Sequence, residues 1–301
     1  ILPALAAAGD ITLVSKDSFG EQGNEYSLAW SISSDGRYVA FESYASNLDP
    51  ICNNEHSHVF VHDNELGETH CISISPGGVQ GNDGSFFPSI SGDGRYVAFE
   101  SLASNLVEDD TNDLCDIFIH EIETGETSRV SVSGANIQVT DHASYHAAIS
   151  ASGAYVAFYS KSEKLVTNDN NGFRDVFVRD LRNKTTVCLT CMIGAEPSNG
   201  NSDWASISAN GQMVAFLSDA SNLVMGDSNG KTDVFVYDLY KEEIRLVSVS
   251  SGGEHGNDIS SYPSISNDGR YVSFSSRSDN LVDEDMNFVD VFVHDLFNKT
   301  T

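Results

Sequence analysis

Short apolar runs alternate with polar segments along the whole chain, and no stretch has the apolar spacing of an amphipathic helix. The runs are rich in valine, isoleucine and phenylalanine, which favours β-strands. The polar segments contain glycine, asparagine and aspartate, which are typical turn residues. This pattern predicts an all-β protein made of short strands.

One sequence unit occurs five times. A segment similar to Ser-x-Asp-Gly-Arg-Tyr-Val-Ala-Phe recurs every 58 or 59 residues, around Gly36, Gly94, Gly153, Gly211 and Gly269. Each copy continues with an apolar run such as Val-Phe-Val, then a turn and a segment similar to Val-Ser-Val-Ser. A fixed period over the whole chain is the signature of a repeat architecture.

Each unit predicts four strands. In the second copy we expect them near residues 86–91, 96–101, 116–120 and 129–133. The second and third strands are apolar at neighbouring positions, so we expect both of their faces to be buried. Antiparallel four-stranded units of this kind, repeated radially, predict a five-bladed β-propeller.

The two ends of the sequence predict how such a ring closes. The fifth copy reaches only its third strand by residue 301, whereas residues 13–24 match residues 246–257 at eight of twelve positions. We therefore expect residues 11–16 to supply the outer strand of the last blade. The strand can come from the same chain or from a neighbouring chain, because either pairing covers an exposed sheet edge.

We expect residues 11–301 to form a single propeller domain, preceded by an apolar arm at residues 1–10. The arm resembles the end of a signal peptide with Ala-x-Ala cleavage options, or it is an apolar arm of the mature chain. Both interpretations favour an exported protein, whether periplasmic, cell-surface or extracellular. No run approaches eighteen apolar residues, so no membrane span is expected.

The repeated residues resemble a known family. Ser-x-Asp-Gly-Arg-Tyr-Val-Ala-Phe-x-Ser, followed by Asp-Val-Phe-Val-x-Asp, is similar to the WD40-like repeats of TolB-type β-propellers, over nearly the whole chain. The resemblance implies a propeller fold and an exported binding scaffold. The proline that usually precedes Asp-Gly is replaced, as at Ser34 and Gly92, and TolB's separate amino-terminal domain has no counterpart. We therefore do not expect TolB's partner in the cell envelope to apply.

The chain is strongly acidic, with 44 Asp and Glu against 16 Lys and Arg and a formal net charge of −28. Such a surface repels phosphate backbones, so nucleic-acid binding is not expected. Cations, or a partner with a basic surface, are the natural counterparts.

An Asp-x-Asn-x-x-x-Asp motif lies between the second and third strands of copies two to four, and we name these segments the acidic loops. Calcium takes six to eight oxygen ligands, which such loops can supply, so calcium is a possible cofactor. The fifth copy is one residue shorter, and the first has Cys52, Asn54 and His58 at the matching places, so it is not expected to bind calcium. The alternative is that these side chains only cap turns. The candidate ligands are Asp110, Asn112, Asp116, Asp169, Asn171, Asp175, Asp227, Asn229, Asp233, Asp285, Asn287 and Asp290.

A second recurring position lies in the loop before the first strand of each copy. First and third strands run in the same direction, so these loops and the acidic loops are expected on one face. That face is the candidate for binding a protein or glycan partner, although turn capping is the simpler role for the recurring residues. They are Asn24, Asn82, Asp141, Asn199 and Asn257.

The five cysteines allow at most two disulfides, with the pairing left open. Cys188 and Cys191 form a C-x-x-C that reads as part of a strand, where positions three apart face opposite ways. We therefore expect neither a zinc site nor redox chemistry from them. Asn183 and Asn298 match glycosylation acceptors within the expected turns.

The sequence contains no Gly-x-Ser-x-Gly, P-loop or dinucleotide fingerprint. The favoured function is therefore a non-enzymatic binding scaffold. One alternative is a self-assembling extracellular fibre subunit, a homo-oligomer or filament linked through residues 1–16. Another is a polysaccharide lyase or glycosidase, which a propeller fold does not exclude.

Overall fold

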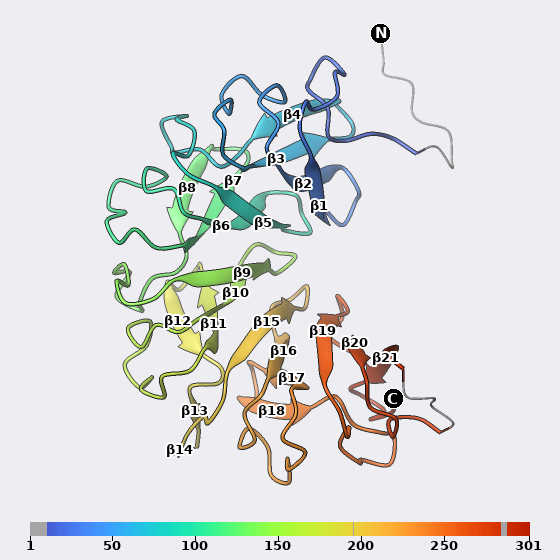
Figure 1. Cartoon of the computed structure of the whole chain (residues 1–301). Coiled ribbons are helices and arrows are strands. Elements are labelled where there is room, and N and C mark those ends of the chain that lie inside the picture. Colours follow the sequence, from blue (N-terminus) through green and yellow to red (C-terminus); the bar gives the residue numbers. More distant parts are fainter. Residues whose placement is uncertain (1–10, 195, 284–287) are drawn as a thin grey trace. The chain divides into compact units, whose positions relative to one another are not determined.

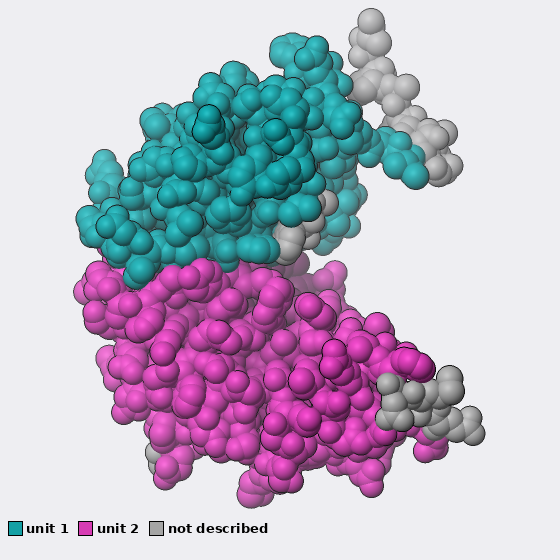
Figure 2. Space-filling model, viewed as in Figure 1, with its two compact units in different colours: residues 1–130 teal, residues 131–301 magenta. Residues whose placement is uncertain are grey.

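The computed structural model describes residues 11–194, 196–283 and 288–301, without the side chains of residues 29 and 30. Every regular element within this part of the chain is a β-strand (Figure 1). The same residues contain no helix long and apolar enough to cross a bilayer. The chain divides into two compact units, residues 1–130 and 131–301 (Figure 2).

The first unit contains two antiparallel four-stranded sheets, each with its strands in sequence order. The first sheet comprises β1 (Ser27–Ile32), β2 (Tyr38–Ser43), β3 (His58–Asp63) and β4 (Glu68–Cys71). The second comprises β5 (Ser85–Ile90), β6 (Tyr96–Ser101), β7 (Asp116–Glu121) and β8 (Glu126–Arg129).

The second unit continues the same pattern and adds a small hairpin. Its four-stranded sheets are β9 (Ser144–Ile149), β10 (Tyr155–Ser160), β11 (Asp175–Asp180) and β12 (Thr185–Cys188), then β15 (Ser202–Ile207), β16 (Met213–Ser218), β17 (Asp233–Asp238) and β18 (Glu243–Leu246). The hairpin is β13 (Met192–Ile193) and β14 (Glu196–Pro197). The last sheet has three strands, β19 (Ser260–Ile265), β20 (Tyr271–Ser276) and β21 (Asp290–Asp295).

The hydrophobic core lies between neighbouring sheets of each unit. In the first unit Val61 of β3 and Phe99 of β6 belong to one buried cluster, and in the second Val178 of β11 joins Phe216 of β16. The predicted burial of both faces of the third strands holds in the first four sheets, and in the first of them all six residues of β3 are buried. It is wrong for β21, whose Val291 and Val293 are exposed. First strands of successive sheets also contact one another within each unit, as β15 does with β9 and β19. Successive four-stranded sheets stacked face to face in this way are the building plan of a β-propeller.

The fourth strand of the second sheet begins earlier than the sequence predicted. In the second copy β8 covers Glu126–Arg129, whereas we expected residues 129–133. The tight turn at Gly125, where φ is +73°, fixes the hairpin register, so pairing with β7 starts immediately after it. Val132 then lies beyond the sheet, buried, in an isolated bridge with Gln138.

The predicted fourth strand of the last sheet is not formed within the described residues. Residues 11–14 belong to no strand, and Lys16 instead bridges Gln22, as Val249 bridges His255 in the fourth copy. The predicted strand at residues 11–16 is therefore wrong at its carboxyl end, because that end belongs to the following loop. The amino-terminal arm lies outside the described residues, and the ring closure, the count of five blades and the single domain stay predictions.

Candidate functional site

In each acidic loop the central asparagine positions the aspartate that begins the third strand. Asn171 Nδ2 donates to Asp175 Oδ2 at 2.8 Å, and Asn171 Oδ1 accepts from the backbone N of Phe173 at 2.8 Å. Asn112 and Asn229 make the equivalent pairs of bonds. The amide oxygen is thus used by the loop itself, and the two carboxylates are the groups left to face a cation.

The third acidic loop buries two carboxylates side by side. Asp169 is 6% exposed, Asp175 is fully buried, and Asp169 Oδ2 makes no hydrogen bond within the described residues. Burial, followed by the nearby Asp175 carboxylate, raises the pKa of Asp169 to about 7. Burial also raises the pKa of Asp175 to about 6, against the bonds that it accepts from Thr190 and Asn171. An unpartnered buried carboxylate oxygen is costly, and a bound cation would remove that cost.

The fourth acidic loop is similar, with one buried and one half-buried carboxylate. Asp233 is fully buried and accepts from Ser248 Oγ at 2.6 Å. Asp227 Oδ1 is buried without a hydrogen-bond partner among the described residues. Burial raises the pKa of both carboxyls. The third and fourth loops therefore present the same hard-oxygen chemistry, which suits calcium.

The second acidic loop differs because an arginine fills it. The side chain of Arg129 is 4% exposed, and its Nη2 lies 3.6 Å from Asp110 Oδ1 while its Nε lies 3.5 Å from Asp116 Oδ2. Both carboxylates are nearly fully buried. Sequence reasoning missed Arg129, although its place at the end of β8 matches Cys188 at the end of β12 and Leu246 at the end of β18.

The first loop carries a covalent cross-link at the same place. Cys52, in the position of Asp110, forms a disulfide with Cys71, which ends β4 as Arg129 ends β8. His58 lies beside them, and burial lowers its pKa to about 4, so the ring is neutral at pH 7. Disulfide sulfurs are poor metal ligands compared with thiolates, which is consistent with the expectation that this loop binds no calcium, and that expectation stays a prediction.

The fifth loop is only partly visible. Asp285 and Asn287 lie outside the described residues, and Asp290, the first residue of β21, is exposed. The predicted role of these three residues as calcium ligands stays a prediction.

The residues predicted to line a binding face tie two neighbouring loops together. Asn24 N donates to Asn47 Oδ1 at 2.8 Å, and Asn24 Oδ1 accepts from Ser46 N at 2.9 Å. Asp141 accepts from Ser162 Oγ at 2.6 Å. The other members make bonds of the same kind as Asn24, and they are Asn82, Asn199 and Asn257. Their contacts are those of turn-capping residues, and a role in ligand contact stays a prediction.

The C-x-x-C segment is a disulfide rather than a continuous strand. β12 ends at Cys188, the chain turns, and Cys188 bonds to Cys191. The strand interpretation of residues 187–191 was wrong because the turn brings both sulfurs to one side. Cys115 is the free cysteine of the described residues, and burial raises the pKa of its thiol, so it is unreactive at neutral pH.

A row of aromatic side chains follows the first strands of the second unit. The rings of His146 and Trp204 have centroids 4.3 Å apart, and those of Trp204 and Tyr262 are 6.0 Å apart. All three residues have positive φ, between 51° and 56°, which is rare for bulky side chains and marks a strained bulge. In the sequence, these three residues share one feature: each lies two residues after the serine that begins its strand. This feature alone does not predict that the rings lie close together. We name these three residues the aromatic row.

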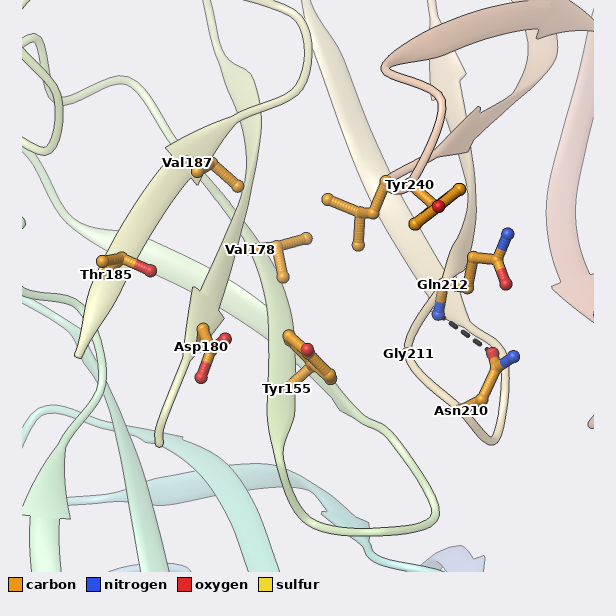
Figure 3. A pocket seen from close by; sticks show the side chains of 10 residues that line it. Tyr155, Val178, Asp180, Thr185, Val187, Asn210, Gly211, Gln212 and Tyr240 are labelled. Atoms are coloured by element: carbon orange, nitrogen blue, oxygen red, sulfur yellow. Dashed lines mark hydrogen bonds between the residues drawn. The ribbon is translucent and has the colours of Figure 1, made fainter. Parts of the chain in front are cut away.

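A cavity of about 370 Å³ lies between the sheets β9–β12 and β15–β18, at the ends opposite their acidic loops (Figure 3). Tyr155, Val178 and Val187 form its apolar wall. Gly211 is required beside it, because a Cβ there would lie 2.2 Å from the Tyr155 ring. Asp180 is the one acidic residue of the lining, so the cavity offers no carboxylate pair for acid–base chemistry.

Comparison with solved structures shows the fold. No protein family model and no curated protein matches the chain. A putative TolB from Agrobacterium tumefaciens is 14% identical, with a TM-score of 0.52, over 93% of this chain and 80% of its own. A prolyl endopeptidase is 17% identical, with a TM-score of 0.53, over 94% of this chain and 36% of its own. The tricorn protease is 13% identical, with a TM-score of 0.50, over 91% of this chain and 25% of its own.

These likenesses place the fold in one class: the chain is a β-propeller-type protein, and its fold is similar to that of TolB. The resemblance seen in the repeats is confirmed at the level of the fold. The chain spans about a third or less of the two peptidases, so their activities do not transfer with the likeness.

Proposed function

We propose that this protein is an exported, non-enzymatic scaffold that binds a protein or glycan partner and is stabilised by calcium. The observation that supports the metal part is a pair of carboxylates in each of the third and fourth acidic loops, of which Asp169, Asp175 and Asp233 are buried and Asp227 is half-buried. In both loops a carboxylate oxygen is buried without a hydrogen-bond partner among the described residues, on Asp169 and on Asp227. A divalent cation supplies the charge and the coordination that each pair lacks.

Thermal unfolding in millimolar CaCl2 and in chelator tests the metal part. Calcium should raise the unfolding midpoint by several degrees, because an ion that binds only the folded state stabilises it. Joint replacement Asp169→Asn and Asp227→Asn should remove that response. Asp93→Asn, in a turn at the other end of its sheet, is the control that should retain it. A wild-type midpoint that calcium leaves unchanged would refute the metal sites.

Export is supported by the two disulfides, Cys52–Cys71 and Cys188–Cys191, which persist in oxidising compartments. Partner binding is supported by the likeness to TolB and by the aromatic row. Trp204 and Tyr262 are 38% and 68% exposed, so their rings are available to stack on a sugar or an apolar side chain.

A glycan array and a cross-linking screen against extracellular proteins, each run with Trp204→Gly, test the partner. Glycine suits the positive φ at this position, so the variant removes the ring without adding backbone strain. A ligand that binds the wild type and the variant equally would exclude the aromatic row. A cationic partner should also bind more weakly as salt increases, given the net charge of −28.

A structural, self-assembling role is the second candidate. It is favoured by the third strand of the last sheet, where Val291 and Val293 are 75% and 52% exposed along an edge that has no fourth strand among the described residues. Open edges of this kind pair with other strands. Size measurement before and after deletion of residues 1–16 distinguishes it, since a chain that is monomeric in both forms is no fibre subunit. The polysaccharide-enzyme alternative stays open to a turnover screen.

A further inference from the structure

In the first four sheets the loop between the second and third strands meets the end of the fourth strand, and the residue at that point differs from sheet to sheet. In the second sheet the group at that point is the guanidinium of Arg129, and in the first it is the Cys52–Cys71 disulfide. In the third and fourth sheets the matching strand ends are Cys188 and Leu246, which carry no charge. The carboxylates of those two sheets therefore have no cation from the fourth strand.

Arg129 places its guanidinium among the carboxylates of the second acidic loop, where a bound cation would lie. Its side chain is 96% buried, yet Nε and Nη2 make no hydrogen bond among the described residues. They lie 3.5 Å and 3.6 Å from the carboxylates of Asp116 and Asp110, the last and first residues of the motif. A third carboxylate, that of the exposed Asp109, lies 3.6 Å from Nη2. Positive charge surrounded by carboxylates, without directed bonding, is also what a calcium ion would provide.

The loop around Arg129 has the same frame as the loops without an arginine. Asn112 Nδ2 donates to Asp116 Oδ2 at 3.0 Å, and in the third loop Asn171 Nδ2 donates to Asp175 Oδ2 at 2.8 Å. The frame is thus built for paired carboxylates whether or not an arginine is present. One residue that differs between the loops is the one that ends the fourth strand.

We propose that Arg129 replaces a metal ion in the second acidic loop, so that the residue ending the fourth strand decides which loops bind calcium. This inference rests on the proposed calcium sites. In the third and fourth sheets, where a disulfide-bonded cysteine or a leucine ends the fourth strand, the carboxylate pair is left to bind calcium. In the second sheet the Arg129 side chain supplies the positive charge instead. In the first sheet a disulfide takes the place of both the loop carboxylate and the arginine.

Two substitutions in the 301-residue chain exchange the two kinds of loop. Arg129→Leu gives the second loop the residue of the fourth, and Leu246→Arg does the reverse. Calcium binding is measured by isothermal titration calorimetry, and thermal unfolding is followed with calcium and with chelator. Arg95→Leu is the matched control, because Arg95 pairs with Glu121 on the exposed turn side of the same sheet.

The expected result is one more calcium ion per chain in Arg129→Leu and one fewer in Leu246→Arg, with no change in Arg95→Leu. Arg129→Leu should also be destabilised in chelator and recover when calcium is added, because removing one partner leaves buried charge uncompensated. If Arg129→Leu folds only with calcium present, that outcome supports the inference too.

Two patterns of failure separate this inference from the proposed function. A wild-type chain that binds no calcium refutes the metal sites and, with them, the exchange. A wild-type chain that binds calcium, with a number of ions unchanged in Leu246→Arg, refutes the exchange alone. Should Arg129→Leu fail to fold in any condition, Leu246→Arg still decides, because its loss of one ion does not depend on the second loop.

Discussion

Asp169 and Asp175 show how burial sets the behaviour of single residues in this protein. Folding raises the pKa of both carboxyls above the ordinary value of 3.8, to about 7 and about 6. Their contribution to the stability of the metal-free protein is therefore fully present below pH 3.8 and is lost as the pH rises through 6 and 7. At the proposed site calcium would reverse this dependence, because the ion binds ionised carboxylates.

Asp169→Asn should therefore gain stability relative to the wild type as the pH rises, when both are in chelator. We expect a gain of about 1 to 3 kcal/mol near pH 8 and almost none below the unfolded-state pKa of 3.8. Urea unfolding of the wild type and the variant at a series of pH values gives the difference in their free energies of unfolding. The contributions of the other titrating groups are the same in both proteins and cancel in this difference. In calcium the sign should invert, since the variant loses a ligand. A difference that does not vary with pH in chelator would mean that Asp169 is ionised at no cost.

The residues of the acidic loops could be found from sequence, but their roles could not. The spacing alone shows that Asn171 lies between two aspartates. The orientation of its amide is set by the hydrogen bond that its Oδ1 accepts from the backbone N of Phe173, which only the structure shows. Arg129 was not predicted as a site residue because its position holds cysteine or leucine in the other copies. Such variation is typical of a position that tolerates substitution rather than of a functional one. The aromatic row depends on positive φ at Trp204, which no composition pattern predicts.

At the scale of elements, the turn between the third and fourth strands offers a matched comparison. Positive φ is found at Gly125, with +73°, and at the equivalent Glu242, with +55°. Glu242→Gly should stabilise the protein by about 0.5 to 1 kcal/mol, because a side chain is disfavoured in this conformation. Gly125→Ala should destabilise it by about 1 kcal/mol through backbone strain alone, because a Cβ there meets no atom within 4 Å.

Urea unfolding of both variants, with Gly134→Ala as a control, measures these effects. Gly134 is absent from the positive-φ glycines of the described chain and also has open space around its Cβ position. The control should therefore change stability less than Gly125→Ala does. Equal losses in the two alanine variants would contradict the role of turn conformation.

The two disulfides close loops of different length and should contribute unequally. Cys52 and Cys71 are 19 residues apart, whereas Cys188 and Cys191 are 3 apart. By the loop-entropy argument, replacing the first pair by alanine should cost about 3 kcal/mol, and replacing the second should cost less. Urea midpoints of the two double variants under non-reducing conditions provide the comparison. A larger loss from the shorter loop would show that local contacts, such as that of Thr190 with Asp175, dominate instead.

Strand positions were predicted best where the repeat and the turn chemistry agree. β6 was expected at residues 96–101 and lies there, because Asp93-Gly94 fixes the turn before it. β8 was misplaced because Val130 and Val132 alternate with serine as strand residues do, although they are buried beyond the sheet. An alternation of apolar and polar residues shows that one side of a segment is buried. A loop that packs against the core produces the same alternation as a strand, so the pattern alone does not distinguish them.

At the scale of the whole molecule, the repeat predicts a strand that the described residues do not contain. Leu13 aligns with Leu246, which pairs with Phe235 of β17, and Phe292 of β21 is the residue equivalent to Phe235. The register therefore predicts that Thr12 lies opposite Val293. Ile11 and Leu13 are 101% and 48% exposed, and the β21 edge is also apolar, so pairing would bury surface on both strands.

Thr12→Pro tests this pairing, with Leu13→Pro as its control. In the fourth copy the N–H of Val247 points into the sheet, to Val234 O at 2.8 Å, and the alternation of a strand gives Thr12 the same inward direction. Proline at residue 12 therefore removes a hydrogen bond, whereas proline at residue 13 removes an N–H that points away from β21. Light scattering and thermal unfolding are recorded for both variants and for the wild type.

If the strand pairs within its own chain, Thr12→Pro lowers the unfolding midpoint and leaves the mass unchanged. If it pairs between chains, the wild type is an oligomer and Thr12→Pro shifts it towards the monomer. In both cases the effect exceeds that of Leu13→Pro, because only the first substitution interrupts the ladder. Two proline variants that match the wild type in mass and midpoint would mean that β21 keeps an open edge, and the repeat would then no longer imply a closed ring.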